Sequence, residues 1–362
     1  MGDIYKELAT HLDNLPGGFP ETASGVELRI LKRLFSPEEA LVATKLTMKP
    51  EPVDAFARRT GDNREELGET LESMAGKGLI FRTYKDGIVM YSAAMFVIGI
   101  WEYHVHDLDA DLVNDVNEYL PHLAREVWDK VETKQLRVVP VSASVAPETA
   151  IASYEDAEQL IRAQSKITVQ PCICRKEHEV VGKPCQYPLE VCFSFGGAAY
   201  YYEQNNIGRS IDVEEALKIL ETGREAGLII QPGNAQKSAN ICMCCSCCCQ
   251  VLKNIKVLEK PAEEVHSNYF AVVDDDECVA CGDCEERCHM DAIIVDDHAE
   301  INLDRCIGCG VCVPACPTSA IQLRAKPQEN TYVPPKLTYQ TYLRMAKERG
   351  KLAAKPATRQ TE

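Results

Sequence analysis

Residues 278–288 read CVACGDCEERC, and residues 306–317 read CIGCGVCVPACP. Both segments carry four cysteines in a C-x2-C-x2-C-x3-C run, the spacing that binds cubane iron–sulfur clusters. Three thiolates within a short turn can hold three corners of one cube, while the fourth starts a helix that points away from that cube. This geometry predicts two 4Fe–4S clusters with exchanged fourth ligands. One cluster is expected on Cys278, Cys281, Cys284 and Cys316, and the other on Cys288, Cys306, Cys309 and Cys312.

The two segments also form an internal repeat. At an offset of 28 residues, Asp276 corresponds to Asp304 and every cysteine corresponds to a cysteine. The apolar pair at 292–293 likewise corresponds to the pair at 320–321, placed to cover the clusters. A zinc ribbon is the alternative, but it requires cysteine pairs separated by a longer gap. The repeat therefore favours iron–sulfur clusters.

Residues 270–323 closely resemble the bacterial-type two-cluster ferredoxins. Pro317 follows the fourth cysteine of the second run, as in that family, whereas His289 stands at the corresponding position of the first run. This departure loosens one helix start and removes no ligand. The resemblance implies one-electron transfer at low potential, and it covers barely a seventh of the chain.

The composition predicts a globular protein of two or three domains. The chain has 362 residues, of which 45% are hydrophobic and 26% charged, as in ordinary soluble proteins. Its start lacks a basic region followed by an apolar one, so we expect no signal peptide. The longest apolar run, residues 93–101, is too short to span a bilayer. Eighteen cysteines without an export signal indicate metal-binding thiolates in a reducing cytoplasm.

The charge is unevenly distributed along the chain. Residues 322–362 carry nine Lys or Arg against three Asp or Glu, so this tail is about +6 while the remainder of the −16 chain is about −22. An acidic body speaks against nucleic acid as a partner. We expect redox partner proteins and no membrane insertion, and membership of an oligomer or a larger complex is compatible with the sequence. The basic tail is expected to lie on the acidic body or on a partner.

The amino-terminal region alternates helical periodicity with turn signals and ends in a hairpin pattern. Ser36, Pro37 and Glu39 form a capping box at one helix start. Helices are predicted over residues 26–35, 37–46, 53–59 and 64–77, and strands over residues 79–84 and 88–91. This order resembles a winged-helix domain, which implies DNA binding through the last helix. That helix exposes four carboxylates (Glu65, Glu66, Glu69 and Glu72) against two cations (Arg64 and Lys77), so we favour a scaffold or protein-docking domain.

A long helix is predicted over residues 107–130, with a kink at Pro121. Histidines and acids before and within it could be imagined as a metal site: His104, His106, Asp107, Asp109 and Asp111. We favour a solvated helix start, because acids there interact well with the helix dipole.

The middle of the chain holds ten further cysteines. Strands are predicted over residues 136–141 and 166–170, and helices over residues 154–163 and 213–226. The cysteines lie in two groups: Cys172, Cys174, Cys185 and Cys192, then Cys242, Cys244, Cys245, Cys247, Cys248 and Cys249. Six thiols within eight residues cannot all bind one cubane, so both groups are expected to converge on one or two shared sites. One or two further iron–sulfur clusters are favoured over zinc, and zinc over reactive dithiols.

Other features of the middle region carry weaker signals. Arg175, Lys176 and Lys183 could lower thiol pKa values or offset cluster charge, or be ordinary surface cations. Gly196–Gly197, followed by tyrosines at 200–202, is better explained by aromatic packing than by a cofactor pocket. No dinucleotide or phosphate-binding motif is present in the sequence.

These observations predict an α+β, multidomain protein with a winged-helix-like start, a cysteine-rich α/β middle and a ferredoxin-like module. The expected parts are residues 1–103, 104–268, 269–325 and the basic tail 326–362. The expected function is electron transfer between a low-potential donor and a redox enzyme in an anaerobic metabolism. An iron–sulfur reductase with a catalytic cluster or dithiol in the middle is the alternative, and a redox-sensing regulator is the third class.

Overall fold

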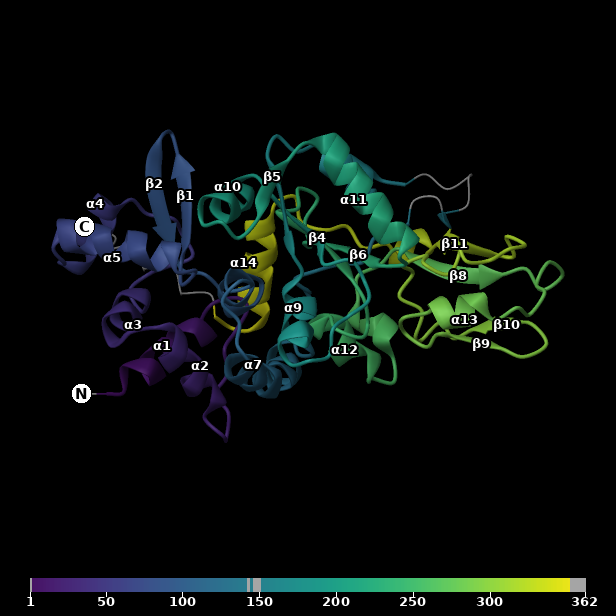
Figure 1. Ribbon diagram of the computed structural model, residues 1–362, viewed down its shortest axis with the longest axis horizontal. Helices are drawn as coiled ribbons and strands as arrows, with labels where there is room; N and C mark the ends of the chain where they lie inside the picture. The colour runs from purple at the N-terminus through teal and green to yellow at the C-terminus, as the bar shows by residue number, and fades with distance from the viewer. Residues whose placement is uncertain (1, 142–143, 146–150, 352–362) are drawn as a thin grey trace, which may run out of the picture.

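The computed structural model describes residues 2–141, 144–145 and 151–351. Helices and strands are mixed along the chain, consistent with the predicted α+β class. Amino-terminal helices lie at one end of the molecule, an antiparallel sheet lies in the middle, and the strands of the cysteine repeat lie at the other end (Figure 1). Three hydrophobic cores follow the same order. The limits of the expected domains remain a prediction.

Five helices and a hairpin form the amino-terminal end. They are α1 (Ile4–Asp13), α2 (Val26–Leu34), α3 (Pro37–Ala43), α4 (Val53–Thr60), α5 (Arg64–Gly76), β1 (Phe81–Lys85) and β2 (Ile88–Ser92). Helix α3 begins at the predicted capping box, where the Glu39 amide donates to Ser36 Oγ at 3.2 Å and the Ser36 amide donates to Glu39 Oε2 at 2.9 Å. The predicted helices and hairpin are present, but the winged-helix resemblance is not confirmed.

Helices α6 (Trp101–Tyr103) and α7 (Ala110–Leu123) pack into the first core together with the amino-terminal helices. Pro121 lies inside α7, and the helix passes directly into a π-helical turn, η2 (Ala124–Trp128). A change in helical pitch after a proline fits the ladder hydrogen bond that proline cannot make.

An antiparallel sheet of five strands forms the middle, in the order β5-β3-β4-β7-β6. Its strands are β3 (Ile167–Pro171), β4 (Glu190–Phe195), β5 (Arg209–Ile211), β6 (Ile229–Pro232) and β7 (Asn240–Cys244). Its helices are α8 (Ala157–Arg162), α9 (Ile173–Val180), α10 (Gly197–Gln204), α11 (Val213–Glu225) and α12 (Gln250–Lys256).

Alternation along β7 determines where its cysteines point. Met243 is fully buried against α11, and a Cβ on Gly223 of that helix would lie 2.5 Å from Met243 Sδ. Successive side chains of a strand point to opposite faces. Cys242 and Cys244, on either side of Met243, therefore share the other face of the sheet.

The strand predicted over residues 136–141 is not formed. The segment makes only isolated bridges beside β6, at Leu136 with Gly233 and at Val139 with Ile230. Pro140 explains the interruption, because proline has no amide hydrogen for a continuous ladder.

The cysteine repeat folds around two short pairs of strands. Strand β8 (Tyr269–Val273) pairs with β11 (Ile321–Ala325), which joins the two ends of the repeat. Strand β9 (Ile293–Val295) pairs with β10 (Ala299–Ile301), and α13 (Asp283–Arg287) lies between β8 and β9 in sequence. The apolar pairs at 292–293 and 320–321 are buried, as expected for residues that cover clusters.

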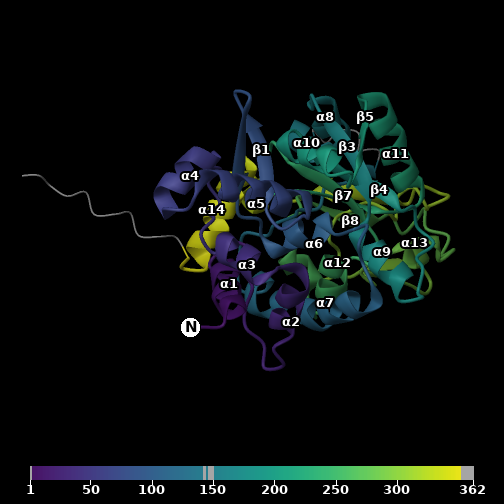
Figure 2. The ribbon, with the colours of Figure 1, turned by 60° about the vertical axis from the view of Figure 1, so that its left-hand side comes forward.

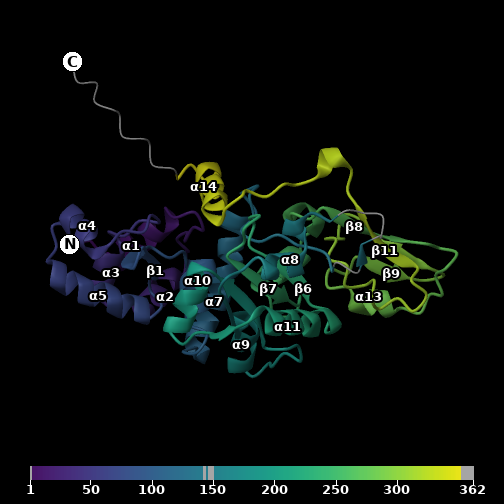
Figure 3. The ribbon, with the colours of Figure 1, turned by 90° about the horizontal axis from the view of Figure 1, so that it is seen from above.

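After β11 the chain returns along the body of the protein (Figure 3). Helix α14 (Thr338–Glu348) then lies near the amino-terminal helices (Figure 2). Arg349 and Lys351 pair with Asp13 at the end of α1, at 2.8 and 2.9 Å. The described part of the basic tail thus packs on the body itself. None of the described helices combines the length and the apolar character needed to cross a membrane.

Candidate metal centres

The first cysteine group of the repeat encloses a small cavity. Four cysteines contribute to its wall: Cys278, Cys281, Cys284 and Cys316. The Ala299 amide donates a hydrogen bond to the sulfur of Cys278 at 3.4 Å. Such amide–sulfur bonds stabilise a thiolate and tune the potential of a bound cluster. The structure thus gathers the ligand set predicted with the exchanged cysteine.

The second group contains the other four cysteines of the repeat: Cys288, Cys306, Cys309 and Cys312. Amides of Ala292 and Ala271 donate to Cys288 and Cys306 sulfurs at 3.3 and 3.5 Å. Burial raises the pKa of Cys309 to about 12, so a metal must displace its proton to bind. The grouping again follows the predicted exchange, and metal binding by both groups remains a prediction.

The two groups differ in their surroundings. Cys288, Cys306 and Cys309 pack against the core that also contains the middle cysteines. The group with Cys278 belongs to the third core, and its Cys281 is exposed. The second group is therefore the one that adjoins the middle domain.

The ten middle cysteines divide into six and four. The six come from separate elements: Cys172 and Cys174 at the start of α9, Cys192 on β4, Cys242 and Cys244 on β7, and Cys249 before α12. The register of β4 with β7 pairs Phe193 with Ile241, which sets Cys192 opposite Cys242. We call this set the six-thiol ring.

Each thiol of the ring influences the pKa of two others, and these pairs form a closed circle. Its order is Cys172, Cys174, Cys249, Cys244, Cys242, Cys192 and back to Cys172. The neighbouring thiols of Cys192 and Cys244 lower the pKa of Cys242 to about 5. The ring therefore brings together six sulfurs from four elements, a donor set suited to soft metals and metal–sulfur clusters.

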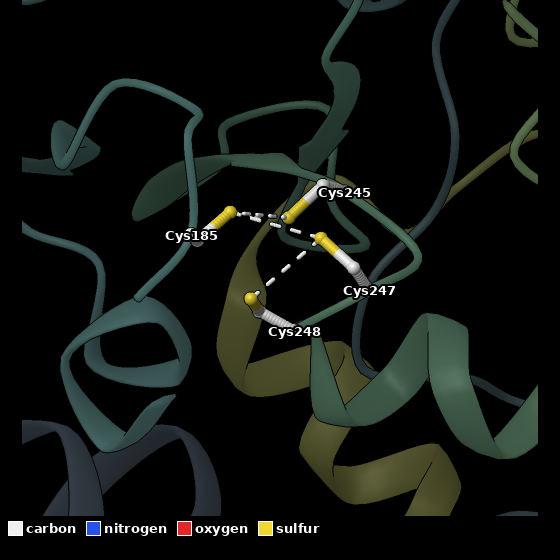
Figure 4. Close-up of side chains that lie close together, drawn as sticks. All are labelled: Cys185, Cys245, Cys247 and Cys248. Carbon is white, nitrogen blue, oxygen red and sulfur yellow. Dashed lines mark hydrogen bonds between the residues drawn. The ribbon is translucent and has the colours of Figure 1, made fainter. Parts of the chain in front are cut away.

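The other four middle cysteines form a second, tighter group: Cys185, Cys245, Cys247 and Cys248. Their sulfurs point toward a common centre from two loops (Figure 4). Cys185 Sγ lies 3.9 Å from Cys245 Sγ and 3.7 Å from Cys247 Sγ, and Cys247 Sγ lies 3.7 Å from Cys248 Sγ. We call this set the four-thiol group.

Arg175 is a buried cation near both sets. Its guanidinium donates to the carbonyls of Pro188 at 2.8 Å and Met243 at 3.0 Å. Burial disfavours the cation, but the nearby thiols, including Cys172 and Cys245, outweigh burial and raise its pKa. A permanent positive charge here offsets thiolate charge. Lys183 is exposed and Lys176 pairs with Glu179 at 2.8 Å, so these two are surface cations.

His289, the departure from the ferredoxin pattern, connects the repeat to the four-thiol group. Its Nδ1 accepts from the Ser246 amide at 3.4 Å, so Nε2 carries the proton and donates to the Gly227 carbonyl at 2.8 Å. Burial lowers its pKa and favours this neutral ring. Ser246 lies between two cysteines of the four-thiol group, while His289 follows Cys288 of the repeat. A proline could make neither contact.

We expect His289→Pro, which restores the ferredoxin pattern, to weaken the docking of the repeat on the middle domain. The iron content of the repeat should be unchanged, because all eight of its cysteines remain. Losing two buried hydrogen bonds costs about 2 kcal/mol in unfolding free energy. Denaturant unfolding with iron analysis checks this. His298→Pro, at an exposed loop, is the control. An unchanged midpoint in His289→Pro would contradict the bridging role.

One large cavity lies against the ring. It has a volume of about 1080 Å³, and all six ring cysteines contribute to its wall, whereas the four-thiol group does not. Side chains from α1, α10 and α14 also line it, including His11, Ala198 and Tyr342. The cavity therefore extends well beyond the sulfurs, and ligand pockets commonly measure about 300–1,000 Å³.

Two carboxyl groups lie near this cavity, Glu102 partly exposed and Glu177 fully buried. Glu102 lines it, and its Oε2 accepts from the Gly99 amide at 2.7 Å. Burial raises the pKa of Glu102 to about 8. Glu177 accepts from the Trp101 indole at 2.7 Å and from Gln250 at 2.6 Å, and burial raises its pKa to about 7. Sequence reasoning missed Glu102, whose only signal was a lone acid directly after the apolar run 93–101.

Other candidate residues have structural roles in the described part of the chain. His104 Nδ1 bonds the Ile100 carbonyl at 2.7 Å, His106 Nε2 bonds that of Ile207 at 3.0 Å, and Asp109 caps α7. They do not converge on a metal site, but the expectation of a solvated helix start is wrong for His104, which is buried. Tyr201 packs in the first core as expected, but Gly197 and Tyr202 line the cavity.

Comparison with known proteins identifies one segment. Residues 271–323 match the family model described as a 4Fe-4S dicluster domain. No curated protein and no solved structure matched the chain. Four of the eight cysteines of that segment surround one small cavity and the other four form the second group, as described above. The protein therefore carries a 4Fe–4S domain of the ferredoxin type on the carboxyl-terminal side of a larger cysteine-rich body.

Proposed function

We propose that this protein is an iron–sulfur reductase whose substrate binds in the cavity beside the six-thiol ring. The observation that carries the proposal is that all six ring thiols line one cavity of about 1080 Å³. A cluster that only relays electrons needs no such space, because it can be enclosed by protein on all sides. The cavity therefore favours a reductase over a simple electron carrier, which was the function favoured from the sequence.

The residues fit metal–sulfur groups at the sites concerned. Sulfur-only donor sets suit iron–sulfur clusters, and Arg175 supplies charge compensation near the ring. Clusters bound there and in the ferredoxin-type domain would supply electrons one at a time. An anaerobic setting suits such clusters and remains part of the proposal.

The packing of the domain supports a direction for electron supply. The group with the exposed Cys281 is accessible to a donor protein, and Val279 beside it is 61% exposed. The second group of the repeat adjoins the core that holds the ring. We infer that a redox partner docks at the Cys278 group and that electrons proceed inward toward the cavity.

The cavity lining favours an apolar substrate. Aromatic and aliphatic side chains dominate the wall, among them Trp101, Tyr103 and Phe81. Glu102 is the acid in this wall placed to donate a proton, because its Oε1 is free of the Gly99 bond. A reduction that adds electrons to an organic acceptor needs such a proton source. The substrate class is therefore an apolar molecule with an electron-accepting group.

Reoxidation kinetics test the proposal. Protein reduced under anaerobic conditions is mixed with a panel of apolar acceptors, such as quinones, enones and aryl halides, and the visible absorbance of its clusters is followed. We expect at least one acceptor to oxidise the wild type at least tenfold faster than Ala198→Trp, which narrows the cavity without removing a sulfur. Ferricyanide, a small surface oxidant, should oxidise both at the same rate. If the wild type and Ala198→Trp were oxidised at equal rates by every apolar acceptor, the reductase proposal would be wrong and the protein would be an electron carrier.

We expect Glu102→Gln to slow reduction of the best acceptor about 100-fold while leaving iron content and ferricyanide oxidation unchanged. The neutral acid is the proton donor, and with a pKa of about 8 it is present below pH 8 and lost as the pH rises through 8. The wild-type rate should therefore fall above pH 8, and this alkaline fall should be absent from the variant. If Glu102→Gln kept the same pH profile, a group other than Glu102 would be the proton donor.

A further inference from the structure

The geometry of the four-thiol group differs from that of the other cysteine sites. The ligand atoms of Cys185, Cys245, Cys247 and Cys248 all lie within 4.8 Å of one another. Among the described residues, no other set of three or more Cys, His, Asp or Glu meets this limit. The two groups of the ferredoxin-type domain, which match a 4Fe–4S family model, are more widely spread.

This difference distinguishes one ion from a cluster. With a metal–sulfur bond of about 2.3 Å and tetrahedral angles, neighbouring sulfurs lie about 3.8 Å apart. Three of the six separations here are 3.7, 3.7 and 3.9 Å, and all six are within 4.8 Å. Thiolates on a cubane must stand farther apart, because they bind four different irons at its outer corners. The four sulfurs are thus spaced for a single ion.

We propose that Cys185, Cys245, Cys247 and Cys248 bind one divalent metal ion, zinc or iron, in tetrahedral sulfur coordination. Sites with four thiolates accept either metal. The proposal differs from the additional cluster favoured from sequence for these residues, and it does not depend on the reductase function.

The surroundings indicate a structural ion. Cys245 and Cys248 are buried, and four protein sulfurs leave no open position for a substrate, as in closed structural sites. The ion would tie the loop carrying Cys185 to the segment 245–248. Ser246 of that segment contacts His289 of the ferredoxin-type domain, with Oγ 3.2 Å from Nδ1. The ion would therefore stabilise the surface on which that domain docks.

Metal analysis of matched variants tests the proposal. Wild type, Cys185→Ser, Cys247→Ser and Gln186→Ala are purified anaerobically, and iron, zinc and sulfide are counted per chain. Gln186 is exposed in the same loop and contributes no sulfur, so it is the control. We expect each cysteine variant to lose about one metal ion and no sulfide, and Gln186→Ala to lose nothing.

The identity of the lost metal distinguishes zinc from iron, and either supports a single ion. Loss of about four irons with four sulfides would show a cubane and overturn the proposal, as would unchanged metal in both cysteine variants. X-ray absorption of the wild type provides a check that needs no variant. Four sulfurs at about 2.3 Å with no nearby metal neighbour are expected at the zinc edge, or at the iron edge as one mononuclear component.

Discussion

Replacing Cys242 with serine should remove the metal bound by the six-thiol ring and abolish reduction of the cavity substrate. Cys242 lies opposite Cys192 of β4 and on the same face of β7 as Cys244, so its loss opens the ring. About eight irons should remain in the ferredoxin-type domain, because none of its eight cysteines belongs to the ring. Iron and sulfide per chain, together with acceptor reoxidation rates, measure both effects.

Cys185→Ser is the matched comparison for this variant. It removes a thiol from the same domain but from the four-thiol group, so the metal of the ring should be retained. Full iron content and full activity in Cys242→Ser would show that the ring does not bind the catalytic metal.

Replacing Cys316 with serine should remove or alter the cluster held by Cys278, Cys281 and Cys284. Cys316 belongs to the second sequence run, yet it lines the small cavity enclosed by those three cysteines. The loss should approach four irons per chain if serine cannot hold that corner. EPR spectra of the reduced protein should retain the signal of the other cluster.

Cys288→Ser provides the reciprocal test. Its thiol lies with Cys306, Cys309 and Cys312, so the second cluster should be the one that changes. If Cys316→Ser disturbed the cluster of its own run and spared the other, the exchanged assignment would be wrong.

The middle cysteines were expected to converge on one or two shared sites, and Cys172→Ala and Cys245→Ala were each expected to lose the same metal. The structure places Cys172 in the ring and Cys245 in the four-thiol group. Single variants at these positions should therefore lose different metals. Strand alternation in the sequence could have predicted that Cys245 is separate from the ring. Cys242 and Cys244 lie two residues apart on one face of the strand, while Cys245 follows directly after the strand.

The sequence by itself determined the features that depend on local spacing. Four cysteines within eleven residues specify the loop of a cubane site, and helix periodicity with Ser36 and Gly61 delimits amino-terminal helices at their correct ends. The same spacing predicted the exchange of the fourth cysteine, and the structure gathers both groups accordingly. Such features are carried by contacts between residues close in the chain, so short patterns are enough to predict them.

Only the tertiary structure decided how the ten middle cysteines divide and what they face. The ring requires the register of β4 with β7 and the placement of α9 and α12 at one sheet face. The cavity requires α1 and α14, more than 320 residues apart in the chain, to pack around the same space. Thiol spacing within a segment cannot specify these arrangements, because they arise from hydrophobic burial summed over distant elements.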